Sequence, residues 1–353
     1  KWTCAKCQIL IQAPVPAHVI DKGIPTTGLL AQVLVAKYHD HQPLYRQEGI
    51  FQRAGLAIPR STLAQWTGAC GVQLQPLVDA MRQALLQSAV LQADETPVAM
   101  LAPGKGKTHR AYLWAYGTTQ YAPIRAVVYD FAEGRSGANA REFLKGWRGK
   151  LVCDDYAGYK ALFTEGVTEV GCLAHARRKF HDLWANHKSP LAEEALTLFG
   201  ALYDVEDLAK ELDAEDRRQL RQLRSKPMAD MLHEWLILQR QRATDGTAIA
   251  KAIDYSLGRW QALVRFLDDG NLPIDNNWLE NRIRPIALGR ANWLFAGSLR
   301  AGKRAAAAMS LVQSAKLNGH DPYRYLKDVL ERLPTLPNSR IEELLPHRWQ
   351  PGC

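Results

Sequence analysis

Long apolar runs are missing from this sequence. No segment approaches the roughly 18 consecutive apolar residues that cross a bilayer, although 47% of the 353 residues are hydrophobic. That share, with 23% charged residues, is ordinary for a globular protein with a large core. We therefore expect two or three domains, no membrane partner and a cytoplasmic location. No secretory signal is visible, but the chain begins at Lys1 rather than Met, so we treat it as a fragment.

Cysteine is scarce and scattered. The six thiols lie at positions 4, 7, 70, 153, 172 and 353, a spacing that indicates no disulfide framework and favours a reducing compartment. Cys4-Ala-Lys-Cys7 matches half of a zinc ribbon, but a closed tetrahedral site needs four ligands and no second Cys-x-x-Cys follows. Zinc is therefore expected only in a longer chain that supplies the other pair, and not here.

Two common catalytic signatures are also absent. The segment 103–108, Pro-Gly-Lys-Gly-Lys-Thr, ends like a P-loop, but Leu101 stands where a P-loop needs glycine, five residues before Gly106. We interpret the segment as a basic loop between strands, whose Lys105 and Lys107 can contact phosphate. No Ser–His–Asp or Cys–His arrangement for nucleophilic catalysis is recognisable either.

Basic residues outnumber acidic ones. The chain has 45 Lys and Arg against 36 Asp and Glu, for a net charge of +9 and an isoelectric point of about 9.2. Such a balance favours a polyanionic partner, most simply nucleic acid.

Local patterns divide the chain into four regions. We predict the C-terminal half of a truncated zinc ribbon over 1–12, a helical region over 13–88, an α/β catalytic domain over 89–300 and a helical C-terminal region over 301–353. Within the catalytic domain, the Leu-rich and charge-rich stretch of about 176–270 is predicted to be a large helical insertion.

The region 13–88 contains a candidate DNA-binding motif. Tyr45–Leu56 and Ile58–Trp66 are predicted to form two helices joined by a glycine-containing turn, with Ser61 or Thr62 as the cap of the second. This pattern resembles a helix-turn-helix. An ordinary helical hairpin packed on the core explains it equally well.

The following residues, 89–175, alternate between strand and helix patterns. Strands are predicted at 89–96, 110–117, 124–131, 150–154 and 168–173, with helices at 136–147 and 156–163. Three sequential strands, then helix, strand, helix and strand, is the order of the ribonuclease H-like fold. We therefore predict an α/β fold with a ribonuclease H-like mixed sheet and flanking helices. By analogy with that fold, the first and fourth strands are neighbours.

Three carboxylates stand out in these elements. Asp94 and Asp154 end the first and fourth predicted strands, and Glu280 lies one turn into a predicted helix. Structural alternatives exist: Asp94 suits a turn, Asn277-x-x-Glu280 matches a capping box, and Pro285 should limit the helix. Three carboxylates from distant segments are, however, what a two-metal site requires. Two Mg²⁺ ions about 3.5–4 Å apart can activate a nucleophile and stabilise the leaving oxygen in phosphoryl transfer.

Five sequence motifs are distinctive when taken together. They are Leu91–Pro97, Leu151–Tyr159, Gly171–Phe180, Pro273–Asn281 and Arg284–Ser298. With these motifs the chain resembles, over nearly its whole length, the insertion-sequence-66 family of DDE transposases. The resemblance implies a ribonuclease H-like core that cuts and joins DNA strands with two Mg²⁺ or Mn²⁺ ions. It implies that Asp94, Asp154 and Glu280 form the catalytic, metal-binding triad. It also implies an N-terminal zinc ribbon, of which this chain holds half, and accessory proteins from the same element.

Other residues near the triad receive secondary roles. Glu95 and Asp155 are left out of the triad, since strand alternation should direct Glu95 to the opposite face. His175 belongs to Cys172-x-x-His175, which is incomplete as a zinc pair, so we favour a position at the rim of the active site. The residues expected to hold the DNA backbone are Lys105, Lys107, Arg177, Arg178, Arg282, Arg284 and Arg290.

Two other functions remain open at this point. A metal-dependent nuclease on the same core would cut DNA without joining it, and a non-catalytic DNA-binding regulator would need no metal. For the transposase, the expected partners are the element ends and a target DNA, with a homodimer or larger assembly when two ends are paired.

Overall fold

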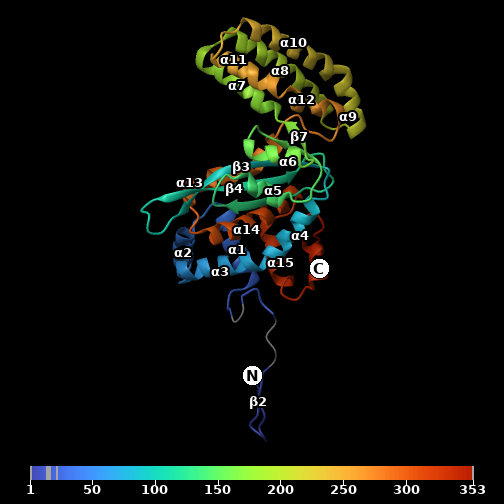
Figure 1. Cartoon of the computed structure of the whole chain (residues 1–353). Coiled ribbons are helices and arrows are strands. Elements are labelled where there is room, and N and C mark those ends of the chain that lie inside the picture. The colour runs from blue at the N-terminus through green and yellow to red at the C-terminus, as the bar shows by residue number, and fades with distance from the viewer. Residues whose placement is uncertain (1, 13–16, 21–22, 352–353) are drawn as a thin grey trace.

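The computed structural model describes residues 2–12, 17–20 and 23–351 (Figure 1). The predicted boundary between residues 12 and 13 borders residues 13–16, which lie outside the described part. The described residues form a mixed α/β fold, as predicted, with a five-stranded sheet between a lobe of helices and a second layer of helices. Among them, no helix combines the length and the apolar character needed to span a bilayer.

The sheet has the strand order β5-β4-β3-β6-β7. Strands β3, β4 and β5 form an antiparallel meander, while β6 and β7 run parallel to β3. The first and fourth strands of the domain, β3 and β6, are therefore neighbours, as the fold analogy predicted. Their bounds are β3 Val90–Leu101, β4 Thr108–Thr118, β5 Val127–Ala132, β6 Lys150–Cys153 and β7 Thr168–Gly171.

Strand β3 is longer than the sequence predicted, and Asp94 is its fifth residue rather than its end. The prediction stopped too early because polar Asp94, Glu95 and Pro97 interrupt the apolar run. Pairing with β4 nevertheless continues to Leu101, while pairing with β6 stops at Gln92. Pro97 is tolerated because it lies on the open side of β3, where no ladder hydrogen bond requires its N–H.

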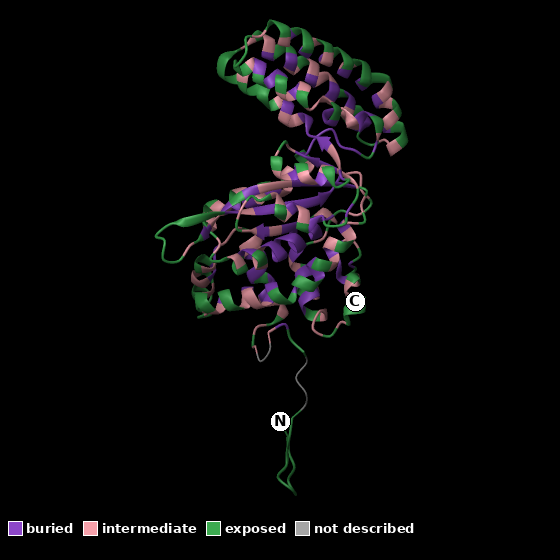
Figure 2. Cartoon of the chain, in the orientation of Figure 1, coloured by how far each residue is buried: buried purple, intermediate pink, exposed green. Residues whose placement is uncertain are grey.

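Helices of the second layer cover one face of the sheet (Figures 1 and 2). Their buried side chains and the sheet residues Leu91, Ala93, Trp114 and Tyr116 belong to one hydrophobic core. The elements beside the sheet or in this layer are α1 Thr27–Tyr38, α2 Leu44–Arg53, α3 Arg60–Gln73, α4 Gln75–Leu85, α5 Gly137–Phe143, the 3-10 helix Ala157–Tyr159, α6 Lys160–Thr164, α14 Leu299–Leu317, α15 Pro322–Arg332 and the 3-10 helix Asn338–Leu344.

The predicted cap of the second helix in the candidate DNA-binding motif is wrong. Helix α3 begins at Arg60 after the cap residue Pro59, so Ser61 and Thr62 lie inside its first turn. The Glu48 carboxylate from α2 instead accepts the Arg60 N–H at 2.8 Å. A side chain from the preceding helix thus supplies the acceptor that a local cap would otherwise provide.

Helix α14 closes the outer edge of the sheet. The Ser310 and Ser314 hydroxyls accept the backbone N–H groups of Tyr129 and Val127 at 2.8 and 3.0 Å, and the Ser314 hydroxyl also donates to the Val127 carbonyl. Buried serines therefore satisfy the polar edge of β5, which would otherwise be an open pairing surface. Close approach of the helix to β5 requires Gly302, since a Cβ there would lie 2.2 Å from the Phe131 ring.

The residues between β7 and α13 form a helical lobe. Its core includes Phe180, Phe199 and Leu232 and continues into the sheet at Val90, Val152 and Val170. Arg221 is completely buried in the lobe, where Glu206 accepts from its Nε and Nη2, and its Nη1 donates to three backbone carbonyls of the 266–272 segment. The elements of the lobe are α7 Leu173–His187, α8 Pro190–Ala209, α9 Ala214–Leu220, a π-helical turn Arg221–Ser225, α10 Lys226–Arg242, α11 Ala248–Gly258, α12 Trp260–Leu263 and the 3-10 turn Arg265–Asp268.

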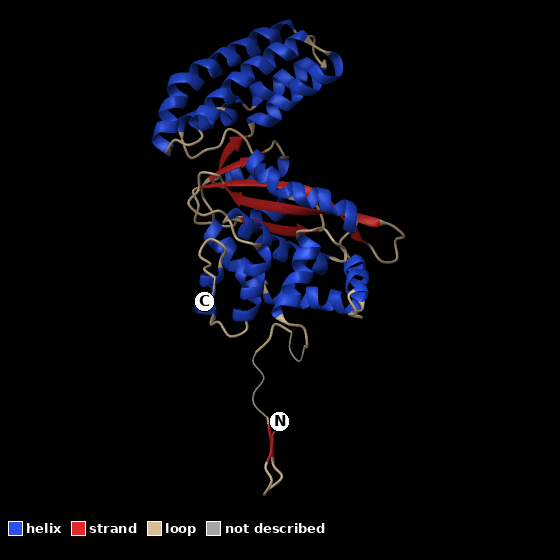
Figure 3. Cartoon of the chain, turned by 180° about the vertical axis from the view of Figure 1, so that it is seen from behind, coloured by secondary structure: helices blue, strands red, loops and turns tan. Residues whose placement is uncertain are grey.

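At the N-terminal end, strands β1 (Trp2–Thr3) and β2 (Leu10–Ile11) form a small hairpin with Cys4 and Cys7 exposed in its turn. Seen from behind, the β3–β4 hairpin extends beyond the rest of the sheet (Figure 3). Its tip is the basic loop 103–107.

Adding a methyl group at Gly302 tests the packing of α14 on the sheet. We expect Gly302→Ala to lower the free energy of unfolding by about 1–3 kcal/mol, because the new methyl group overlaps the buried Phe131 ring. Gly200→Ala in α8 is the control, since its Cβ meets nothing within 4 Å and removing a helical glycine should stabilise by about 1 kcal/mol. Denaturant unfolding of both variants measures the difference; equal effects would contradict the close packing.

Candidate active site

Strand register places Asp94 and Asp154 side by side. Gln92 pairs with Val152 in the parallel β3–β6 ladder, and each aspartate lies two residues beyond its member of this pair. Because side chains alternate along a strand, both aspartates continue the face of Gln92 and Val152. Adjacent strands lie about 4.8 Å apart, so the two carboxylates are neighbours on one face. The backbone N–H of Tyr156 holds Asp154 Oδ1 at 2.9 Å.

Glu280 reaches the same face on helix α13 (Asn277–Trp293). The start of this helix is fastened to β3 immediately before Asp94: the Asn276 side-chain amide donates to the Ala93 carbonyl at 3.0 Å, and Gln92 donates to the Asp275 carbonyl at 3.3 Å. These bonds lie just where β3 loses its partner β6. Glu280, one turn into the helix, is thereby brought to the aspartates.

The capping-box alternative for Glu280 is not formed. Asn276, rather than Asn277, is the cap residue of α13, and Asp275 accepts the Asn277 N–H at 2.9 Å. Within the described part of the chain, Glu280 Oε1 is buried and has no hydrogen-bond partner. The carboxylate is therefore free of its own helix start.

Pro285 does not end the helix as expected; α13 continues through it for two more turns. The turn around the proline is held by tertiary contacts, since Ile283 and Ile286 are buried against the sheet and the Tyr129 hydroxyl donates to the Arg282 carbonyl at 2.7 Å. Packing has outweighed the local cost of an internal proline, about 3 kcal/mol.

The carboxylates of Glu280 and Asp154 lie close enough to Asp94 to affect its pKa. Burial raises its pKa to about 8, and the charges of Glu95, Glu280 and Asp154 act in the same direction, against a hydrogen bond from the Glu95 N–H. Clustered carboxylates of this kind disfavour one another's ionisation unless a cation compensates them. The carboxylate oxygens of the cluster are the type of ligand that Mg²⁺ or Mn²⁺ prefers, so the residues present fit such ions.

Glu95 and Asp155 are engaged elsewhere. Glu95 Oε2 accepts from the Tyr159 hydroxyl at 2.7 Å, and Arg135 binds Glu95 Oε1 at 2.5 Å while lying 4.0 Å from Asp154. Burial raises the pKa of Glu95. Asp155 pairs with Arg259, which also binds Glu169 at 2.6 Å. Arg135 is a site residue that the sequence analysis missed, because nothing in its local sequence reveals that it bridges two carboxylates.

Cys172 and His175 lie beside Glu280. His175 Nδ1 is 3.8 Å from Glu280 Oε1, and the Arg178 guanidinium is 3.7 Å from Glu280 Oε2. Cys172 is buried, its Sγ accepts the Asn276 N–H at 3.2 Å, and burial raises the pKa of its thiol to about 12. His175 thus lies beside Glu280 and lines the open cleft described below.

The residues predicted to hold DNA differ in their surroundings. Lys105 and Lys107 are exposed at the tip of the β3–β4 hairpin, and Arg177 and Arg178 lie on the first turns of α7. On α13, Arg284 is exposed, whereas Arg282 stacks over Trp278 with 4.3 Å to the ring centroid, and Arg290 donates to the Pro97 carbonyl at 2.6 Å. Arg282 and Arg290 thus already serve the packing of α13.

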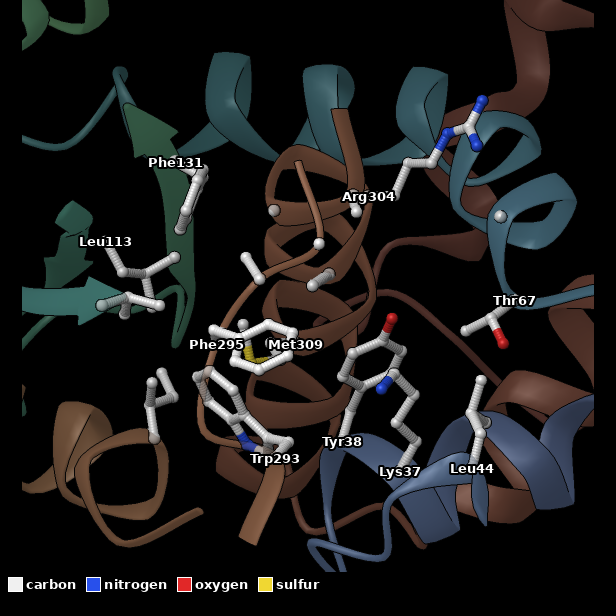
Figure 4. Close-up of a pocket in the computed structure, with 18 of the residues that line it drawn as sticks. Lys37, Tyr38, Leu44, Thr67, Leu113, Phe131, Trp293, Phe295, Arg304 and Met309 are labelled. Carbon is white, nitrogen blue, oxygen red and sulfur yellow. The ribbon is translucent and has the colours of Figure 1, made fainter. Parts of the chain in front are cut away.

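An open cleft of about 480 Å³ adjoins the triad. Its walls include Asp154, His175, Arg178 and Arg135. A separate groove of about 370 Å³ lies farther along α13, among Tyr38, Trp293, Phe295 and Met309, with Lys37 and Arg304 nearby (Figure 4). That groove is mainly apolar and holds none of the triad residues, so the carboxylate chemistry belongs to the first cleft.

Comparison with known proteins places the chain in a family. The sequence model of the family described as "Transposase IS66 family" matches residues 22–304, and the "IS66 C-terminal element" matches residues 310–347. Three relatives come from Sinorhizobium fredii (strain NBRC 101917 / NGR234), each described as an uncharacterized protein. They are y4qI, 39% identical over 98% of this chain and 66% of its own length, y4jD, 37% over 99% and 71%, and y4hP, 35% over 99% and 67%.

The present chain thus spans about two thirds of the length of the curated relatives that it matches. Both family models together cover the helical layer, the sheet, the lobe and the C-terminal helices. With this coverage, the sequence resemblance and the site geometry point the same way: the chain belongs to the IS66 transposase family.

Proposed function

We propose that this transposase cleaves DNA at the ends of its element and joins the freed ends to target DNA by a DDE mechanism. The observation that supports the proposal most is the convergence of Asp94, Asp154 and Glu280 on one face of the sheet, where burial raises the pKa of Asp94 and the nearby carboxylate charges raise it further. In the proposed reaction, water breaks a phosphodiester and leaves a 3′-hydroxyl. That hydroxyl then attacks a target phosphodiester and displaces its 3′-oxygen.

The three carboxylates would hold two Mg²⁺ or Mn²⁺ ions, which would supply activation of the attacking oxygen and stabilisation of the leaving oxygen. The chain's own cations would bind and orient the substrate. Arg178 and His175 lie in the open cleft beside Glu280, where an incoming phosphate would meet them. Lys105 and Lys107, on the projecting hairpin, would contact the DNA backbone away from the reacting bond. Pairing of two element ends favours a dimer or larger assembly, with accessory proteins of the element as further partners.

Charge removal at the triad tests the chemistry. We expect Asp94→Asn, Asp154→Asn and Glu280→Gln each to reduce strand cleavage and strand transfer by at least about 10³-fold. The three carboxylates would act together, so the loss of one should cost nearly as much as the loss of all three. DNA binding should persist. Asp182→Asn, at the rim of the same cleft, is the matched control and should remain active.

The assay should supply both intact and pre-cut element ends together with target DNA. Cleavage without joining of pre-cut ends would identify a nuclease rather than a transposase. Full activity of Glu280→Gln would show that the assigned triad is wrong.

Metal binding should depend on pH through Asp94. Its carboxyl group is protonated below about 8 in the metal-free protein, so a cation must displace a proton there. We expect Mg²⁺ or Mn²⁺ affinity to rise up to about tenfold per pH unit and to level off above about pH 8. Calorimetry in buffers of different ionisation enthalpy measures both affinity and proton release.

The free energy of unfolding of the metal-free protein should fall as pH rises, whereas metal affinity should increase. The folded state keeps the Asp94 proton to higher pH than the unfolded chain, so stability falls as pH rises from about 4 to 8. Asp94→Asn should remove this component of both pH profiles. Profiles identical in the parent and the variant would contradict the raised pKa.

Salt dependence of DNA binding tests the hairpin lysines. Each phosphate contact contributes about 0.9 to the slope of log affinity against log salt, so Lys105→Ala with Lys107→Ala should reduce that slope by about 2. Lys210→Ala with Lys251→Ala removes the same charge from exposed positions in the helical lobe and is the control. Equal slopes for the two double variants would show that the hairpin lysines do not contact the DNA backbone.

A further inference from the structure

Tertiary structure completes a ligand set that the sequence left incomplete. Cys172 and His175 are one turn apart at the start of α7, and two ligands do not make a metal site. Helix α13 adds Glu280, from more than a hundred residues away in the chain. One sulfur, one nitrogen and one oxygen from these three residues all lie within 4.8 Å of one another.

Two of these atoms are buried and uncommitted. Among the residues that the structure describes, neither His175 Nδ1 nor Glu280 Oε1 has a hydrogen-bond partner, although they are only 3.8 Å apart. Leaving a buried polar atom unsatisfied costs roughly 1–3 kcal/mol. A cation between them would satisfy both, while Arg178 would keep its contact with the other oxygen of Glu280.

The surroundings of Cys172 suit an anionic sulfur once a cation is present. Its Sγ already accepts the Asn276 N–H at 3.2 Å, and the N-termini of α7 and α13 meet at this point. Helix N-termini favour negative charge and stabilise thiolates. The thiol proton would leave to solvent as the metal–sulfur bond forms, so the change in charge is balanced.

The donor atoms select the type of ion. Mg²⁺ takes oxygen ligands, whereas a set of thiolate, imidazole and carboxylate suits Zn²⁺ and similar borderline ions. Three protein ligands also leave one coordination position open, as in catalytic rather than structural zinc sites.

We propose that Cys172, His175 and Glu280 bind a divalent cation of the zinc type next to Asp94 and Asp154. Glu280 belongs to both ligand sets, and this sharing rests on the proposed function. The site itself is defined by side-chain geometry and stands even if the chain joins no DNA.

Cobalt titration tests the site directly. The parent for the test carries Cys4→Ser and Cys7→Ser, so that the N-terminal thiols contribute nothing. We expect Co²⁺ to give a thiolate-to-metal charge-transfer band and strong visible bands of four-coordinate cobalt. Zn²⁺ should abolish both, and excess Mg²⁺ should leave the charge-transfer band in place.

Variants in the same parent assign the ligands. Cys172→Ser should eliminate the charge-transfer band, and Cys70→Ser, at another buried thiol, should retain it. His175→Ala keeps the thiol and should weaken Co²⁺ binding by at least about 10–100-fold. This is the loss typical when a residue that only hydrogen-bonds to a metal ligand is mutated, and a direct ligand should matter at least as much. Asp94→Asn should retain the band while losing strand transfer, which separates this site from the proposed function. Absence of the band in the folded parent, or its survival in folded Cys172→Ser, would overturn the proposal.

Discussion

The hydrogen bond from the Asn276 side chain to the Ala93 carbonyl fixes the geometry on which the candidate active site depends. Pairing between β3 and its parallel neighbour β6 ends at Gln92, so the Ala93 carbonyl on that side is free to accept from a side chain. Asn276 at the start of α13 donates to this carbonyl, and the Gln92 side chain donates to the Asp275 carbonyl. A helix far along the chain is thereby fastened one residue before Asp94. Farther along, Arg290 and the Ala296 backbone bond the same open edge of β3.

This arrangement concentrates negative charge at a buried location. Burial raises the pKa of Asp94, and the charges of Glu95, Glu280 and Asp154 raise it further. Arg135 lies beside Asp154 and Arg178 beside Glu280, whereas neither forms an ion pair with Asp94 in the described part of the chain. Such a cluster is unfavourable for folding by itself and favourable for binding cations, since an ion removes the repulsion. Backbone and amide hydrogen bonds hold the segments that carry the carboxylates together, and Arg135 and Arg178 pair with carboxylates of the cluster.

The helical lobe helps to position residues of the candidate active site. It leaves the sheet after β7 and returns before α13, and buried Arg221 binds three carbonyls of the returning segment. Its first helix carries Cys172, His175 and Arg178 to Glu280. The Leu173 N–H also bonds the Ile274 carbonyl, so the departure and return of the chain are joined at the triad. The lobe and α13 thus form a continuous support for one face of the sheet (Figure 1).

The sequence alone determined the order of strands and helices, the fold class and the candidate carboxylates, because apolar periodicity and short motifs are local. It also indicated the family. Tertiary structure decided how far β3 runs, that α13 passes through Pro285, and that Glu48 supplies the acceptor at the start of α3. It also left Glu280 Oε1 without a hydrogen bond to its own helix start. It likewise joined Arg135 to two carboxylates and Glu280 to Cys172 and His175. These features depend on side chains more than a few turns apart in sequence, whose packing energies exceed the local preferences that a sequence pattern records.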